Sequence, residues 1–266
     1  MPPRLFDWFR FFAAAGPSRA LHSSRGVSTA ARVARRVCFI FAAILTLSWS
    51  VSAAAAEEFS VAERALFMTN HLEGLATPAM LQYTFRKSGT LEDSFDDKVA
   101  VALKAQPRAT CCAATTEFLS GARRVRLPEI ESVTGNPVIL HFLERDINEM
   151  QRLTKGQPNY FRKRIRMAIF QGAQVSDVEV PYGGKQLAAR QIMISPYAGD
   201  PLRARYEKLA DKQYVFTLSK DVPGGVYAIR SRINGASPDA PPLLAEEMVF
   251  DPASRALHLT PGAAKP

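Results

Sequence analysis

Residues 136–172 read NPVILHFLERDINEMQRLTKGQPNYFRKRIRMAIFQG and contain two helix patterns in succession. Asn136 followed by Pro137 is typical of a helix start, because an Asn side chain caps free N–H groups and proline suits the first helical turn. The spacing of apolar residues predicts one helix over 136–154 and a second over 160–170, each ending at a glycine. Both helices carry an apolar face, so we expect both to pack against a larger apolar surface.

Asp146 is the unusual residue of the first predicted helix. It falls within a broad apolar face, with Phe142 and Met150 one turn to either side. An ionised carboxylate buried without a partner is costly, so Asp146 is expected to be paired, protonated or exposed to a polar cavity. One interpretation is a structural ion pair in the core. The other is a polar anchor in an apolar ligand site formed by Phe142, Asp146, Met150, Phe161 and Ile165.

Basic residues lie beside the apolar stripe of the second predicted helix. They are Arg162, Lys163 and Arg166. A solvated outer face of an ordinary covering helix explains such a stripe. The alternative is a surface for anionic lipid headgroups or an acidic protein partner, because cations beside apolar residues suit an interface. The three residues are therefore candidate headgroup or partner contacts.

Strand patterns lie on both sides of the helix pair. A capping box, Ser60 to Glu63, opens a predicted helix over 60–72, and apolar and polar residues alternate in the segments that follow. Strands are predicted at 81–85, 99–103, 115–119, 124–127, 175–181, 186–195, 202–209, 213–219, 226–233, 244–250 and 256–259. Their short connections favour antiparallel pairing. The predicted fold class is therefore α+β: a curved, unclosed, barrel-like antiparallel sheet with an N-terminal helix and a two-helix lid inserted between strands.

The N-terminal segment, residues 1–56, is predicted to be a leader and signal peptide. Its uncharged part, 37–56, follows arginines and precedes acidic residues, and the strongly apolar portion is shorter than a bilayer span. Cleavage after Ala56 would release a single α+β domain, 57–260, with a disordered tail, 261–266. An uncleaved anchor is the alternative. The expected location is the periplasm.

The charge balance changes when the leader is set aside. The whole chain has a net charge of +9, but the leader holds seven of the 34 basic residues and one of the 25 acidic residues, which leaves +3. A balance so near neutrality predicts no nucleic-acid partner.

Cys111 and Cys112 are adjacent in the predicted mature chain. Neighbouring Cα atoms lie about 3.8 Å apart, below the usual disulfide range. In a strand their thiols would point to opposite faces. Two small residues in ordinary strand positions are therefore favoured over a disulfide between neighbours, and intermolecular pairing stays open.

Motifs for catalysis are missing from the sequence. It contains no Gly-x-Ser-x-Gly, phosphate loop, Cys-x-x-Cys or His-x-x-x-His, and His71, His141 and His258 are scattered. These histidines are expected at the surface or in caps. We predict that the protein is not an enzyme, with no catalytic residue, cofactor or metal ligand.

The layout resembles the Lol-type fold of periplasmic lipoprotein carriers and their outer-membrane receptors, an unclosed β-barrel with a helical lid. The segments that carry the resemblance are SVAERALFMTNHLEGL, LQYTFRK, NPVILHFLERDINEM and NYFRKRIRMAIF, set in that order with the helix pair between strands. They include no diagnostic motif. The resemblance implies a concave apolar face that holds acyl chains, and it implies no particular site residue.

Two functions follow as hypotheses. The first is a non-catalytic periplasmic protein that binds a lipid or other hydrophobic ligand, with a carrier or sorting role. The second is a protein-interaction or assembly factor without a small ligand. A core too full to admit a ligand would favour the second.

Overall fold

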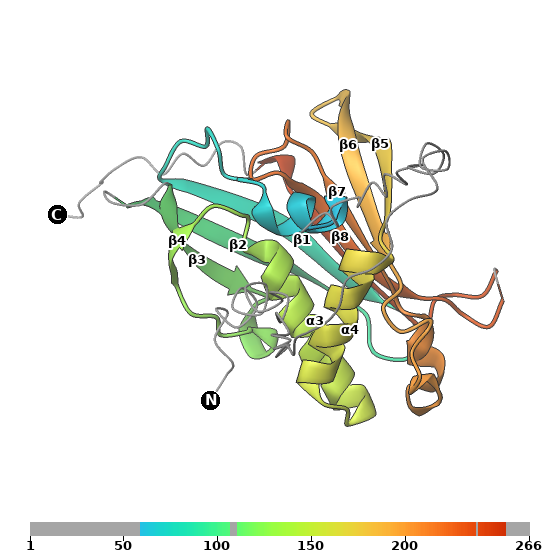
Figure 1. The fold of residues 1–266 in the computed structure, drawn as a ribbon. Coiled ribbons are helices and arrows are strands. Elements are labelled where there is room, and N and C mark those ends of the chain that lie inside the picture. The colour runs from blue at the N-terminus through green and yellow to red at the C-terminus, as the bar shows by residue number, and fades with distance from the viewer. Residues whose placement is uncertain (1–58, 107–110, 238, 254–266) are drawn as a thin grey trace, which may run out of the picture. The chain divides into compact units, whose positions relative to one another are not determined.

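The computed structural model describes residues 59–106, 111–237 and 239–253. Its described part contains one antiparallel sheet of nine strands in the order β4-β3-β2-β1-β9-β8-β7-β6-β5 (Figure 1), which confirms the predicted fold class. The strands are β1 Ala79–Ser88, β2 Phe95–Ala105, β3 Cys112–Phe118, β4 Ile130–Val133, β5 Gln174–Tyr182, β6 Lys185–Ile194, β7 Gln213–Leu218, β8 Val226–Ile233 and β9 Leu244–Phe250.

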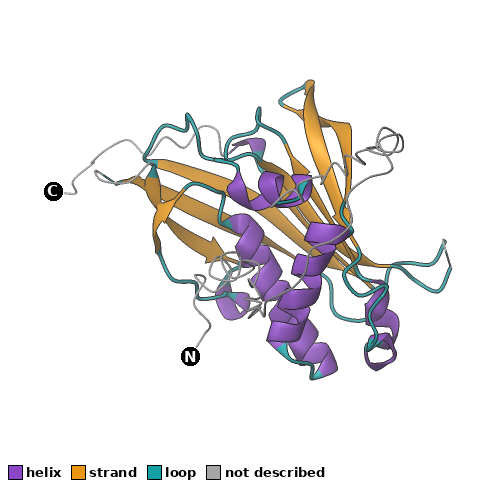
Figure 2. Cartoon of the chain, in the orientation of Figure 1, coloured by secondary structure: helices purple, strands orange, loops and turns teal. Residues whose placement is uncertain are grey.

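Two helices, α3 (Val138–Thr154) and α4 (Pro158–Gln171), connect the two edges of the sheet. Strands β1 to β4 follow one another outward, β5 to β9 return from the other edge, and β9 pairs with β1. Each strand therefore pairs with the next one in the sequence, except that β4 and β5 form the two edges of the sheet. The helix pair lies between these two strands in the chain and crosses one face of the sheet (Figures 1 and 2).

The covered face is built by alternation along the strands. In β1, every second residue from Ala79 to Lys87 is buried, and the residues between are half-buried or exposed. Register joins these positions into rows across the sheet. One apolar row is Phe85, Met248, Ile229, Phe216 and Ile192.

The start of α3 is tied to three other segments by Asn136. Its side-chain oxygen accepts the N–H of Val138, and its side-chain nitrogen donates to the Tyr83 hydroxyl and the Gly224 carbonyl, each at 2.8 Å. Its own N–H donates to Nδ1 of His71 at 3.2 Å. All polar groups of this buried side chain are thus satisfied, and the predicted helix start is confirmed.

The turn between α3 and α4 is tight. Lys155 adopts a left-handed conformation, with φ of 57°. A Cβ atom placed on Gly156 would lie 2.5 Å from Cζ of Phe161, so the ring of Phe161 packs directly on the glycine. The glycine allows α4 to fold back beside α3.

Two predicted strands are wrong. Residues 202–209 form parts of two 3-10 helices, Arg203–Arg205 and Glu207–Asp211, and the apolar residues Leu202, Tyr206 and Leu209 have helical spacing. Residues 124–127 make one isolated bridge, Phe118 to Val125, and Pro128 lacks the N–H needed to extend pairing there. Strand β4 takes that edge instead. The strand predicted at 256–259 lies outside the described residues.

The N-terminal helix is shorter than predicted. The capping box is present, and the helix consists of α2 (Val61–Glu63) followed by a wider turn, Arg64–Met68. It ends there because Thr69 is extended and its hydroxyl donates to the Arg64 carbonyl. No helix of the described residues is long and apolar enough to cross a membrane.

The two cysteines form a disulfide, with Cα atoms 3.7 Å apart, so the favoured expectation of unpaired thiols is wrong. Cys112 is the first residue of β3, and Cys111 precedes the strand. The argument from opposite strand faces fails because only one of the two residues belongs to the strand.

Candidate functional site

A row of buried polar side chains crosses the sheet beneath α3. Lys87 on β1, Glu246 on β9, Ser231 on β8 and Tyr214 on β7 are register neighbours in that order. Together with Lys212, just before β7, we call them the polar belt. All five are buried, which is unusual for lysine and glutamate unless they are paired.

The second half of α3 binds this belt. Nζ of Lys212 and the hydroxyl of Tyr214 donate to the two carboxylate oxygens of Asp146. Arg145, the residue before Asp146, donates to Glu246 at 2.9 Å, and Glu149, about one turn further along α3, accepts a hydrogen bond from Lys87 at 2.9 Å. These bonds therefore attach α3 to three strands, β1, β9 and β7.

The hydroxyl of Tyr214 keeps its proton in this network. Burial raises the pKa of Tyr214 well above its ordinary value, and the charge of Asp146 raises it further, so the hydroxyl remains a donor. Burial also raises the pKa of Asp146, against the opposing effect of Lys212. Asp146 thus has the structural ion pair of the first interpretation.

The five predicted ligand residues are all buried, with exposures of 0% for Phe142, Asp146, Met150, Phe161 and Ile165. None lines the cleft beside α3 or the smaller cavity beside α4 that are described below. Phe161 instead packs edge-on against Tyr197 and Tyr206, with ring centroids 5.8 and 5.6 Å apart. These five side chains are therefore packed into the apolar layer between helices and sheet.

The predicted basic stripe is divided by the structure. Arg162 donates through two nitrogens to both carboxylate oxygens of Glu144, each at 2.7 Å, and joins α4 to α3. Lys163 is exposed, and Arg166 is half-buried. A smaller cavity of about 270 Å³ lies beside this helix, between Met167 on α4 and Met193 on β6.

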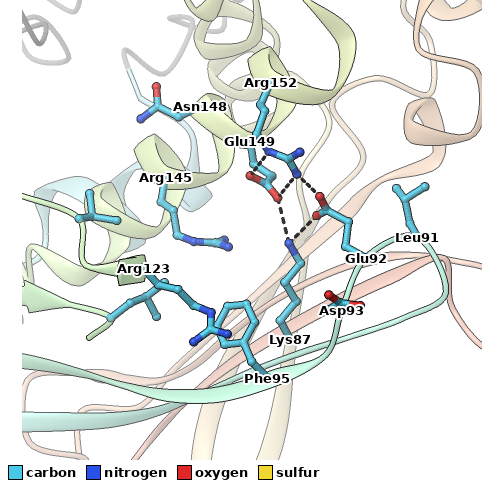
Figure 3. Close-up of a pocket in the computed structure, with 12 residues that line it drawn as sticks. Lys87, Leu91, Glu92, Asp93, Phe95, Arg123, Arg145, Asn148, Glu149 and Arg152 are labelled. Carbon is cyan, nitrogen blue, oxygen red and sulfur yellow. Dashed lines mark hydrogen bonds and ion pairs between the residues drawn. The ribbon is translucent and has the colours of Figure 1, made fainter. Parts of the chain in front are cut away.

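A larger cleft of about 780 Å³ opens beside α3 (Figure 3). Three segments line it: α3, the connection from β1 to β2, and residues 119–125 after β3. Its basic side chains are Lys87, Arg123, Arg145 and Arg152. Its apolar side chains are Leu91, Phe95, Leu119 and Val125. This combination of cations and apolar groups is the candidate site.

At one side of the cleft the cations are paired. Lys87 donates to Glu92 at 2.6 Å, and Arg152 donates to Glu149 at 2.8 Å and also contacts Glu92 (Figure 3). Burial opposes ionisation of Glu149, but hydrogen bonds from Arg152 and Lys87 outweigh it and hold its pKa below the usual range. The two cations and the two carboxylates thus pair with one another, so Lys87 and Arg152 both have acidic partners.

At the other side, two arginines lie over two stacked rings. The guanidinium carbon of Arg123 is 4.3 Å from the ring centroid of Phe95, and that of Arg145 is 5.0 Å from Phe85. The two rings are stacked with centroids 5.8 Å apart. Arg145 is paired with Glu246, whereas the guanidinium of Arg123 has no hydrogen bond or ion pair with another described residue.

Two buried charges of the polar belt, Lys87 and Glu246, were not predicted as site residues, although their positions in the strands give a signal. Lys87 follows Leu81, Tyr83 and Phe85 in the alternation of β1, and Glu246 has an inward position in β9. An inward charge in a strand predicts a buried ion pair. Lys212 lies between a turn and β7, so strand alternation does not predict that its side chain is buried.

One of the three histidines, His141, is not placed as predicted. His141 is buried on α3, and its ring nitrogens have no hydrogen-bond partner among the described residues. His71 is part of the Asn136 cluster, and His258 lies outside the described residues. Within the described part of the chain, no group of three or more His, Cys, Asp or Glu residues is placed to hold a metal ion.

Comparisons with known proteins identify no family. No family model matches the chain, and no curated protein matches its sequence. Among solved structures, the chain is similar to the Mycobacterium tuberculosis lipoprotein LppX at 8% sequence identity and a TM-score of 0.29, with 66% of this chain and 86% of that chain covered. A likeness at this TM-score supports no conclusion about function, so the site is argued from its own geometry.

Proposed function

We propose that the protein is an exported, non-catalytic binding protein for a lipid or other amphipathic ligand, held in the cleft beside α3. The observation that carries the proposal is the lining of this cleft, in which apolar side chains and cations face the same space. The signal pattern of residues 37–56 supports export. The layout of an unclosed sheet with a helix pair across it supports a carrier role of the kind that the Lol-type resemblance implies.

Binding would come mainly from the apolar wall. Burying apolar surface contributes about 25 cal/mol per Å², before the cost of ordering the ligand. The half-buried ring of Phe95 and the exposed side chain of Leu91 offer such surface. The polar belt would keep α3 in place, so Asp146 has a structural role in this proposal.

Native mass spectrometry of the mature protein, purified gently from the periplasm and followed by organic extraction, tests the proposal. A discrete added mass, released by solvent and identified as a lipid or another amphiphile, is the expected result. A clean apoprotein mass, with no uptake from a panel of lipids, would contradict it.

A matched pair of substitutions locates the ligand. Leu91→Asp in the cleft is expected to lower affinity for the extracted ligand about tenfold, because one leucine contributes about 1.5 kcal/mol of apolar contact. Met68→Asp is the control, since Met68 is at least as exposed, at 55% against 45%, and does not line the cleft. Equal losses in both variants would place the ligand elsewhere.

The second candidate function, a protein-interaction or assembly factor, is favoured by the burial of all five predicted ligand residues and by an exposed apolar group at the end of α4. Met167 and Phe170 lie on one face of α4, Val175 follows at the start of β5, and Ser60 beside Val61 donates to the Ile169 carbonyl. Photo-crosslinking from position 170 would give one defined adduct if a partner binds there. Position 117 on β3 serves as the control.

A further inference from the structure

We infer that the Arg123 side of the cleft is an oxyanion subsite, so that the ligand is an amphiphile whose head is a carboxylate or a phosphate ester. The inference rests on the proposed function, because it names the chemistry of the same ligand. It is carried by the difference in pairing between the two sides of the cleft (Figure 3).

The paired side cannot provide this subsite. Lys87 and Arg152 already share the carboxylates of Glu92 and Glu149. An incoming anion there would compete with acids held by the protein at contact distance. Arg145 is likewise engaged, since its 2.9 Å bond to Glu246 compensates a carboxylate with 0% side-chain exposure.

Arg123 is different because its direct contact is a ring, and the carboxylate of Asp97 interacts with its charge only at longer range. Stacking on Phe95 uses the flat face of the guanidinium and leaves its N–H groups at the edge. Those N–H groups form a planar fork that matches two oxygens of a carboxylate or phosphate. The ring also restricts the orientation of the side chain, so less conformational freedom is lost on binding.

The surroundings place the apolar part of the ligand beside this fork. Leu119 and Val125 come from the same short segment as Arg123, and all three line the cleft. Arg126, three residues after Arg123 in the sequence, is exposed and adds positive potential. Asp93 is the lining acid outside the paired network, and it would partly oppose an anion.

The experiment uses the mature protein and three probes with the same twelve-carbon chain: dodecanoate, dodecyl phosphate and the neutral dodecyl maltoside. Binding is measured by isothermal titration calorimetry below the concentration at which each probe forms micelles. Both anionic probes are expected to bind at least tenfold more tightly than the neutral probe. A preference between dodecanoate and dodecyl phosphate then identifies the head group.

Two neighbouring arginines give a matched comparison. Arg123→Gln is expected to reduce affinity for the anionic probes about tenfold or more and to leave dodecyl maltoside unchanged. Arg124→Gln is the control, because Arg124 is exposed like Arg123 but pairs with Glu117 at 2.7 Å and does not line the cleft. Asp93→Asn should tighten binding of both anions, and the thermal midpoint of each variant checks its fold.

The outcomes separate the inference from the proposed function. Equal affinity for neutral and anionic probes, or equal losses in the Arg123 and Arg124 variants, would overturn the oxyanion subsite and leave an amphiphile site. Failure of all three probes and of lipid extraction would overturn both.

Discussion

Asn136 shows how one side chain can hold several segments in place. It joins the start of α3 to β1 through Tyr83, to the turn before β8 through Gly224, and to His71. Because Nδ1 of His71 accepts this N–H, its Nε2 carries the proton that is donated to the Ala65 carbonyl. The network therefore also defines the tautomer of the histidine.

Asn136→Ala is expected to lower the free energy of unfolding by about 2 to 4 kcal/mol, because it removes a cap and leaves a buried hydroxyl and a buried carbonyl without their donor. Urea denaturation followed by circular dichroism measures the change. Asn148→Ala, at an exposed position of α3, should change stability little. Similar losses in the two variants would show that the Asn136 network contributes nothing specific.

His141 predicts a pH dependence of stability. Burial lowers its pKa from 6.5 to about 4, so the folded protein keeps the ring neutral while the unfolded chain takes up a proton. The stabilising contribution is complete above pH 6.5 and is lost as the pH falls towards 4, by about 3 kcal/mol in total. Denaturation curves at closely spaced pH values measure it.

His141→Phe is the comparison, because it has no proton to bind. Between pH 6.5 and 4.5 its stability should fall less steeply than that of the original protein. His71, whose pKa is also lowered by burial, contributes equally to both proteins. Parallel curves would mean that protonation of His141 is not linked to unfolding.

Helix α3 is attached to the sheet in two ways. Its first half packs through residues such as Val138 and Phe142, and its second half binds the polar belt. Helical periodicity predicted α3 and α4 closely, because each has one apolar face and is followed by a glycine within two residues. It gave no information about the belt, since the partner of Asp146 lies 66 residues away.

The Asp146 and Lys212 pair provides a double-mutant cycle. Asp146→Leu and Lys212→Met should each cost about 3 to 5 kcal/mol, because each leaves a buried charge without its partner. The double variant Asp146→Leu with Lys212→Met should cost far less than the sum. Chemical denaturation gives the four free energies.

Ligand retention in Asp146→Ala separates structure from binding. We expect lower stability with unchanged retention of the co-purified ligand, because Asp146 binds the polar belt and does not line the cleft. Loss of ligand at full stability would restore the interpretation of Asp146 as a polar anchor. Asp211→Ala, at the exposed pair with Arg203, is a control that should change stability little.

At the scale of the molecule, the order of strands makes the end of the chain central to the sheet. Strand β9 lies between β1 and β8, and the N–H of Asp251 just beyond it donates to the Gln82 carbonyl at 2.8 Å. The first and last strands therefore complete each other. Strands β1 and β8 therefore each lack one neighbour until β9 has been synthesised.

A chain ending after Gly235 is expected to lose cooperative thermal unfolding, because β1 and β8 would each lose their shared partner. A chain ending after Ala253 keeps the nine strands of the described residues and should retain a cooperative transition. Circular dichroism on heating distinguishes them. A cooperative transition in the shorter chain would show that the sheet folds without β9.

The sequence alone determined the kinds of elements and the fold class. Alternation, helical spacing and caps are local properties, so they predicted the strands around the helix pair and the two helices across the sheet. They failed at 202–209 and at the end of the first helix, where short turns depend on tertiary contacts. They also placed the ligand site in the apolar layer, where all five predicted residues are buried.

The tertiary structure alone decided which charges meet and where space remains. The polar belt exists because the register of four strands aligns Lys87, Glu246, Ser231 and Tyr214. The cleft exists because three segments distant in sequence meet beside α3. Periodicity determines the face on which a residue lies, but its partner depends on strand register and helix position, which are set by packing across the whole sheet.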